Sequence, residues 1–171
     1  GLSGGEGAGG EGGGGEGGGV FGYDVGAAMV VFGAETGPGI LTVADIDGSN
    51  GFIAVGSADD MAAGFVVTGG GDLNGDGIGD VVMATRSFDQ NGPEAFVLFG
   101  TDTGFERIVD LGTVGGATGF TIESEGSYAD RHITSLAMAG DVNGDGFDDL
   151  LLGLADMGTY GAGGEGGTVD N

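Results

Sequence analysis

Two aspartate-rich segments carry oxygen-bearing side chains at a spacing that suits a divalent cation. The first is residues 71–80, Gly-Asp-Leu-Asn-Gly-Asp-Gly-Ile-Gly-Asp, and the second is residues 140–149, Gly-Asp-Val-Asn-Gly-Asp-Gly-Phe-Asp-Asp. They match at seven of ten positions, so that Asp72 of the first corresponds to Asp141 of the second. Counted from the first Asp, side-chain oxygens fall at positions 1, 3, 5 and 9, glycine at position 6 permits a sharp turn, and the residue at position 7 offers its carbonyl oxygen. Because Ca²⁺ takes about six to eight oxygens, the spacing predicts two calcium sites. The predicted ligands are Asp72, Asn74, Asp76, Asp80 and the Ile78 carbonyl in the first site, and Asp141, Asn143, Asp145, Asp149 and the Phe147 carbonyl in the second.

The residues after each segment argue against a helix–loop–helix calcium site. An EF-hand loop has an acidic residue at position 12 and continues into a helix. Here position 12 is Met83 in the first segment and Leu152 in the second, and short apolar runs typical of strands follow both. The sequence therefore predicts calcium loops between strands. The alternative is a pair of Asp- and Gly-rich turns that bind nothing.

Charge and composition restrict the partners. The 171 residues include 27 Asp and Glu against 3 Lys and Arg, which gives a formal net charge of −24. Such a surface repels phosphate backbones and anionic lipid, so we expect neither nucleic-acid binding nor membrane insertion. The absence of Cys excludes disulfides and zinc–thiolate sites, while 39% hydrophobic residues suffice for a folded core. The chain begins at Gly1 rather than Met, and we interpret it as part of a longer protein.

An internal repeat organises the chain. Residues 1–19 are mostly Gly with a few Glu, and we expect a flexible loop or tail there. Three landmarks then occur twice in the same order and at nearly the same offset: Val-Val-Phe-Gly at 30–33 and Val-Leu-Phe-Gly at 97–100, Gly-Phe at 51 and at 119, and the two acidic loops. Short apolar runs between Gly and Asp clusters indicate an all-β fold. The predicted organisation is the end of a preceding unit at 20–33, one repeat at 34–100 with its loop at 72–80, and a second repeat at 101–171 with its loop at 141–149, incomplete at its C-terminal end.

Each repeat is expected to hold about four short strands. In the second repeat they are predicted around 95–99, 119–122, 133–137 and 149–152. A four-stranded unit has the size of one β-propeller blade. One such sheet cannot bury both of its faces, so neighbouring units must stack on it.

These landmarks together resemble the FG-GAP repeat, the blade unit of integrin alpha-subunit propellers and of many bacterial extracellular proteins. The resemblance covers residues 20–154. Two features depart from the family pattern: the usual Gly-Ala-Pro after the apolar strand is replaced by Ala-Thr-Arg at 84–86 and Gly-Leu-Ala at 153–155, and Gly79 stands where the second loop has Asp148.

The resemblance implies a propeller fold and an extracellular role. Of a seven-bladed β-propeller, this chain would hold about two to two and a half blades of four short antiparallel strands. The implied function is a calcium-binding structural, adhesion or ligand-recognition module, secreted or at the cell surface and without enzymatic activity. The implied partners are an extracellular protein or glycan and the neighbouring blades of the same chain.

Two alternatives stay open from the sequence. FG-GAP repeats also accompany phospholipase-type and other secreted hydrolases, so the chain could be the non-catalytic propeller part of such an enzyme. Alternatively, it could be an acidic, Gly-rich, disordered segment that binds calcium.

Other residues with chemical potential are interpreted more simply. His132 is expected to be a surface or loop-packing residue, because no nucleophile elbow accompanies it. The pair Asp59–Asp60 is expected in a solvated turn, and residues 45–51, although acidic, in a turn between strands. The core of the repeats is expected to include Phe96, Phe99, Phe105 and Phe120.

Overall fold

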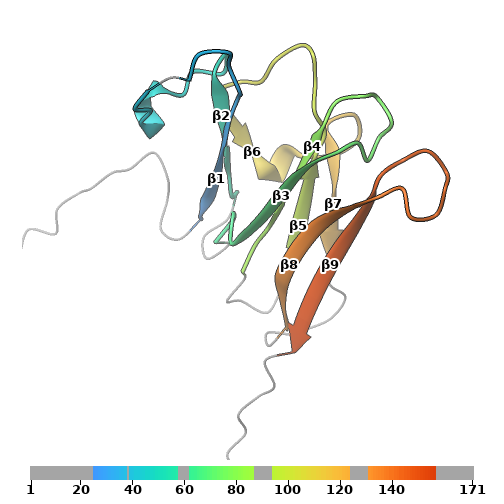
Figure 1. Cartoon of the computed structure of the whole chain (residues 1–171). Helices are drawn as coiled ribbons and strands as arrows, with labels where there is room; N and C mark the ends of the chain where they lie inside the picture. Colours follow the sequence, from blue (N-terminus) through green and yellow to red (C-terminus); the bar gives the residue numbers. More distant parts are fainter. Residues whose placement is uncertain (1–24, 38, 58–61, 87–93, 124–130, 157–171) are drawn as a thin grey trace, which may run out of the picture.

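The structure, a computed structural model, describes residues 25–37, 39–57, 62–86, 94–123 and 131–156. Within these ranges it is all-β, as predicted, with several sheets of which none closes on itself (Figure 1). No helix in these ranges has the length and apolar character needed to cross a membrane. The strands are β1 (Ala27–Val31), β2 (Gly51–Val55), β3 (Val66–Gly71), β4 (Asp80–Ala84), β5 (Glu94–Leu98), β6 (Ile108–Asp110), β7 (Gly119–Glu123), β8 (Arg131–Gly140) and β9 (Asp149–Asp156), with 3₁₀ turns η1 (Val43–Asp45) and η2 (Leu111–Thr113).

A four-stranded antiparallel sheet, in the order β3-β4-β5-β7, forms the centre of the molecule. On one side lies the sheet β1-β2-β6, in which β1 and β2 are antiparallel and β6 runs parallel to β2. On the other side lies the two-stranded antiparallel sheet β8-β9, and β8 packs beside β3. The central sheet is thus covered by a smaller sheet on each face.

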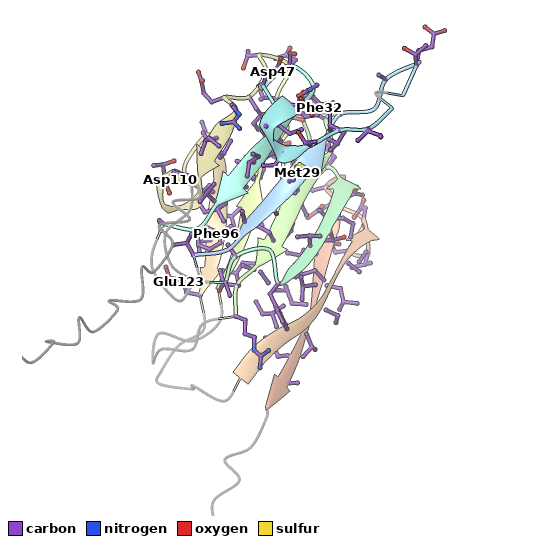
Figure 2. The ribbon with its side chains drawn as sticks, turned by 90° about the vertical axis from the view of Figure 1, so that its left-hand side faces the viewer. Met29, Phe32, Asp47, Phe96, Asp110 and Glu123 are labelled. Carbon is purple, nitrogen blue, oxygen red and sulfur yellow. The ribbon has the colours of Figure 1, made fainter. Side chains whose placement is uncertain are left out.

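This layering explains why β4 after Asp80 and β5 after Glu94 are apolar. Side chains alternate between the two faces of a strand, so consecutive residues enter different layers. Met83 and Phe96 pack toward the first sheet, in a cluster with Phe52, whereas Val82 and Val97 pack toward β8 and β9. Figure 2 shows side chains filling the space between the ribbons of neighbouring sheets. Burial on both faces accounts for apolar runs in place of polar–apolar alternation.

The four strands predicted for the second repeat are all present, but they belong to two sheets. Strands β5 and β7 complete the central sheet, whereas β8 and β9 form a sheet of their own. The sequence period gives the length of the repeating unit but not where a sheet begins within it. A further strand, β6, was not predicted, and it joins the sheet β1-β2-β6 by pairing with β2 through Ile53↔Ile108 and Ala54↔Val109.

The prediction of a core position for Phe120 is wrong, because its side chain is 42% exposed. Phe96 is buried as predicted, and Phe99 and Phe105 are partly buried. The matching residue of the first repeat shows the reason. Phe52 is fully buried under the ring of Phe105, with ring centroids 4.2 Å apart, and no described segment covers Phe120 in this way.

Candidate calcium-binding loops

The two acidic segments form matching loops at the same end of neighbouring sheets (Figure 1). The first loop joins β3 to β4, and the second joins β8 to β9. Strand β4 begins at Asp80 and strand β9 at Asp149, which are the residues at position 9 of the loops. The prediction that a strand, and not a helix, follows each loop is confirmed.

The carboxylate of Asp72 organises the first loop. Its Oδ1 accepts hydrogen bonds from the backbone N–H groups of Gly75 (2.7 Å) and Asp76 (3.0 Å), and its Oδ2 accepts one from Gly77 (2.8 Å). The backbone can curl around one side chain because Gly75 and Gly77 have φ values of +76° and +84°, which glycine adopts readily. An Asp at position 1 with glycines at positions 4 and 6 therefore determines the local fold.

The side chains at positions 3 and 5 turn back onto the same loop. Asn74 Oδ1 accepts from the backbone N–H of Asp76 at 3.0 Å, and Asp76 Oδ1 accepts from that of Ile78 at 2.8 Å. In addition, Asn74 Nδ2 donates to Asp76 Oδ2 at 2.9 Å. The structure thus brings the predicted ligands at positions 1, 3 and 5 together in one turn.

The carboxylate at position 9 of the first loop accepts one hydrogen bond from within the loop and one from outside it. Asp80 is completely buried, and its Oδ2 accepts from the Leu73 N–H at 2.7 Å while its Oδ1 accepts from the Gly100 N–H at 2.8 Å. Gly100 ends the Val-Leu-Phe-Gly landmark, and a Cβ there would come within 2.6 Å of the Gly79 carbonyl oxygen. Asp80 therefore ties the loop to the end of β5, which explains why the acidic loop and the Phe-Gly pair occur together.

The second loop reproduces the first, bond for bond. Seven hydrogen bonds within the first loop have counterparts between the corresponding residues of the second, with closely similar donor–acceptor distances. Asp141 accepts from Gly144, Asp145 and Gly146 as Asp72 does in the first loop, and Asp149 accepts from the Val142 N–H. We call these bonds the loop hydrogen-bond set.

The donor set fits a hard cation in part. Carboxylate and amide oxygens at positions 1, 3 and 5 suit Ca²⁺, and they line the same turn. Within the described ranges, however, no three Asp, Glu, His or Cys side chains form a group arranged to hold a metal ion. Position 3 is an Asn in both loops, and both oxygens of Asp80 already accept from backbone amides. The ligand assignments at all five positions of both loops stay predictions.

Hydrogen bonding lowers the pKa of Asp141. The main cause is the N–H of Gly146, followed by those of Gly144 and Asp145, and desolvation opposes them. A depressed pKa means that Asp141 stabilises the folded loop above its unfolded pKa and loses this effect as the pH falls through its folded pKa. In a carboxyl NMR titration with EDTA present, we expect Asp141 to titrate below the ordinary value of 3.8. A midpoint at or above that value would contradict the loop hydrogen-bond set.

In the other acidic segment, residues 45–51, the side chains form hydrogen bonds with residues close in the sequence. Asp47 Oδ1 accepts from both the N–H and the hydroxyl of Ser49, which lowers the pKa of Asp47, and Asn50 Nδ2 donates to the Asp45 carbonyl at 2.8 Å. The segment connects η1 to β2, so it follows a 3₁₀ turn and not a strand. Figure 2 shows Asp47 at the tip of this connection.

A hollow of about 750 Å³ lies beside the first loop. Asn74, Asp76 and Ile78 line one side, and residues of the long connection from β5 to β7 line the rest, including Thr101 and Thr118. No sequence pattern indicated this hollow, because it depends on how the connection folds back against the loop.

Comparison with known proteins adds nothing to the interpretation of the site, which therefore rests on its geometry. No protein-family model, no curated protein and no solved structure matches the chain.

Three predictions lie outside the described residues: the flexible tail at 1–19, the pair Asp59–Asp60, and the side chain of His132.

Proposed function

We propose that the chain is a calcium-binding segment of an extracellular β-propeller, with a structural or adhesion role. The observation that carries the proposal is the loop hydrogen-bond set. Two loops in equivalent places of the repeat hold the side chains at positions 1, 3 and 5 in the same arrangement, with the same backbone partners. A turn selected only to reverse the chain would not need the same four oxygen-bearing side chains twice.

The sheet arrangement supports the propeller part of the proposal. By the repeat offsets, β1 and β2 correspond to β5 and β7, and β8 and β9 correspond to β3 and β4. The central sheet would then be one whole blade, and the flanking sheets would be the second half of a preceding blade and the first half of a following one. Stacking of four-stranded sheets face to face is how propellers bury their blades.

Calcium, when bound, supplies positive charge to side-chain oxygens that otherwise repel one another. The chain itself orients these oxygens, because Asp72 and Asp141 are held by three backbone N–H groups each. Neither loop ends on a bidentate Glu, so we expect dissociation constants on the order of 10⁻⁴–10⁻³ M, in the range of extracellular modules. This affinity suits a protein outside the cell.

The hollow beside the first loop supports a recognition role for the same module. The described residues that line it include Asp76, Asp102, Glu106 and Asp110, and none of these described lining residues is Lys or Arg. An acidic lining disfavours anionic ligands. A neutral glycan or a basic segment of an extracellular protein would fit this charge.

Calorimetric melting tests calcium binding. At 10 mM calcium, each site is expected to stabilise the fold by about 1.4–2.7 kcal/mol, as follows from mass action at the expected affinities. The melting temperature should therefore rise with calcium and return to its starting value with EDTA. A melting temperature indifferent to both would overturn the proposal.

Matched variants assign the sites. Asp76→Ala and Asp145→Ala should each reduce the calcium stoichiometry in isothermal titration from two to one. Glu35→Gln removes an exposed carboxylate outside both loops and should leave it at two. A stoichiometry unaffected by either Ala variant would mean that calcium binds elsewhere.

A further inference from the structure

The two loops are joined to each other by a reciprocal pair of hydrogen bonds. The backbone N–H of Asp72 donates to Asp148 Oδ2 at 2.9 Å, and the backbone N–H of Asp148 donates to the Asp72 carbonyl at 2.9 Å. Asp72 is position 1 of the first loop. Asp148 lies between Phe147 and Asp149, the predicted ligands at positions 7 and 9 of the second loop. The contact therefore links the predicted ion-binding residues of one loop to those of the other.

Packing reinforces this contact. The ring of Phe147 lies over Gly75 so closely that a Cβ on Gly75 would come 2.6 Å from Phe147 Cε1. Below the loops, the side chain of Met138 on β8 occupies the space where Gly71 of β3 lacks a side chain. The two loops thus pack against each other, and so do the strands β3 and β8 that precede them.

Position 8 is where the two loops differ in charge. The first loop has Gly79 and the second has Asp148. All oxygens that shape the second loop come from other residues, namely Asp141, Asn143, Asp145 and Asp149. The carboxylate of Asp148 is therefore not needed by its own loop, and its hydrogen bond goes to the neighbouring one.

We propose that Asp148 couples the two loops, so that a divalent cation bound in one raises the affinity of the other. This inference rests on the proposed calcium binding. An ion in the second loop orders Phe147 and Asp149 and with them Asp148, which holds the backbone of Asp72. The ion that binds next, in the first loop, then finds that loop already ordered. Less conformational entropy is therefore lost when it binds. By thermodynamic linkage, an ion in the first loop raises the affinity of the second loop by the same factor.

Repulsion between two bound ions opposes this coupling. Salt at about 0.15 M screens that repulsion over about 8 Å, whereas the hydrogen bonds and the ring contact act directly between the loops. The loops also carry seven carboxylates between them, so the pair remains negative with two divalent ions bound. We therefore expect positive coupling of about fivefold, at the low end of the usual range.

A double-mutant cycle on the whole chain tests the coupling. The calcium midpoint of the first loop is followed through the amide NMR signal of Gly77 at 0.15 M salt. Asp145→Ala disables the second loop and should weaken calcium binding at the first about fivefold. Asp148→Gly, which places in the second loop the residue that the first loop has, removes the side-chain bond but keeps the backbone bond and the Phe147 contact. It should therefore weaken this dependence, so that adding Asp145→Ala shifts the first-loop midpoint by less than about fivefold.

A calcium-free measurement tests the bridge itself. With EDTA present, Asp148→Gly should speed hydrogen exchange of the Asp72 amide, Asp148→Asn should keep it slow because an amide oxygen still accepts, and Glu35→Gln should not change it. Equal exchange in Asp148→Gly and the unmodified chain would overturn the inference. Two ions bound with independent midpoints would overturn the coupling alone, whereas no calcium uptake at either loop would overturn the proposed function and the coupling with it.

Discussion

Replacing Asp80 by alanine is expected to destabilise the fold by roughly 3–5 kcal/mol, because a buried charged acceptor with two hydrogen bonds is lost. The carboxylate of Asp80 is completely buried and accepts from the N–H groups of Leu73 and Gly100. In the variant, the N–H groups of these two partly buried residues lose this partner. Urea unfolding with EDTA present measures the loss in the absence of any bound cation.

The second loop provides a matched control for this prediction. Asp149 occupies the same position, is only partly buried, and accepts from the Val142 N–H. Asp149→Ala should therefore cost roughly 1–2 kcal/mol, because one hydrogen bond to a charged acceptor is lost and water can reach the site. Equal losses for Asp80→Ala and Asp149→Ala would contradict the role given to Gly100 as the second donor.

The loops could be predicted from the sequence because their structure is local. Asp72 reaches N–H groups three to five residues away, so the spacing of Asp and Gly alone contains the information. The strand after each loop was also predictable, from the apolar run that begins after Asp80 and after Asp149. What spacing does not contain is the second partner of Asp80, because Gly100 is 20 residues away.

The contacts between sheets could not be predicted either, because they join residues that are far apart in the sequence. Strand β6 has three residues, and its pairing with β2 joins positions far apart in the sequence, such as Ile53 and Ile108. Phe52 and Phe120 are equivalent in the sequence repeat, yet only Phe52 is covered by another aromatic ring at stacking distance. Asp148 could be noted in the sequence as a departure from the first loop, but its contact with Asp72 required the structure.

The Gly-Phe landmark has a steric explanation that the sequence did not supply. Gly119 begins β7 opposite Leu98, with φ at +147°, and a Cβ there would overlap the carbonyl oxygen of Val97. Gly51 begins β2 in the same way, with φ at +156° and the carbonyl oxygen of Val30 in the path of a Cβ. At both positions the paired strand comes too close for any side chain, so glycine is required where each of these two strands begins.

Gly119→Ala is therefore expected to destabilise the protein by roughly 2–4 kcal/mol, because strand β7 must move away from β5 to admit a methyl group. Alanine substitutions at two neighbouring glycines serve as controls, one with free space and an ordinary backbone and one with free space and a strained backbone. A Cβ on Gly115 meets nothing within 4 Å, so Gly115→Ala should change the stability by less than about 0.5 kcal/mol. Gly116 has equal space but a φ of +61°, so Gly116→Ala should cost roughly 1–2 kcal/mol from backbone strain alone. Urea midpoints of the three variants decide the matter: if Gly119→Ala costs no more than Gly116→Ala, close approach of β5 does not explain the landmark.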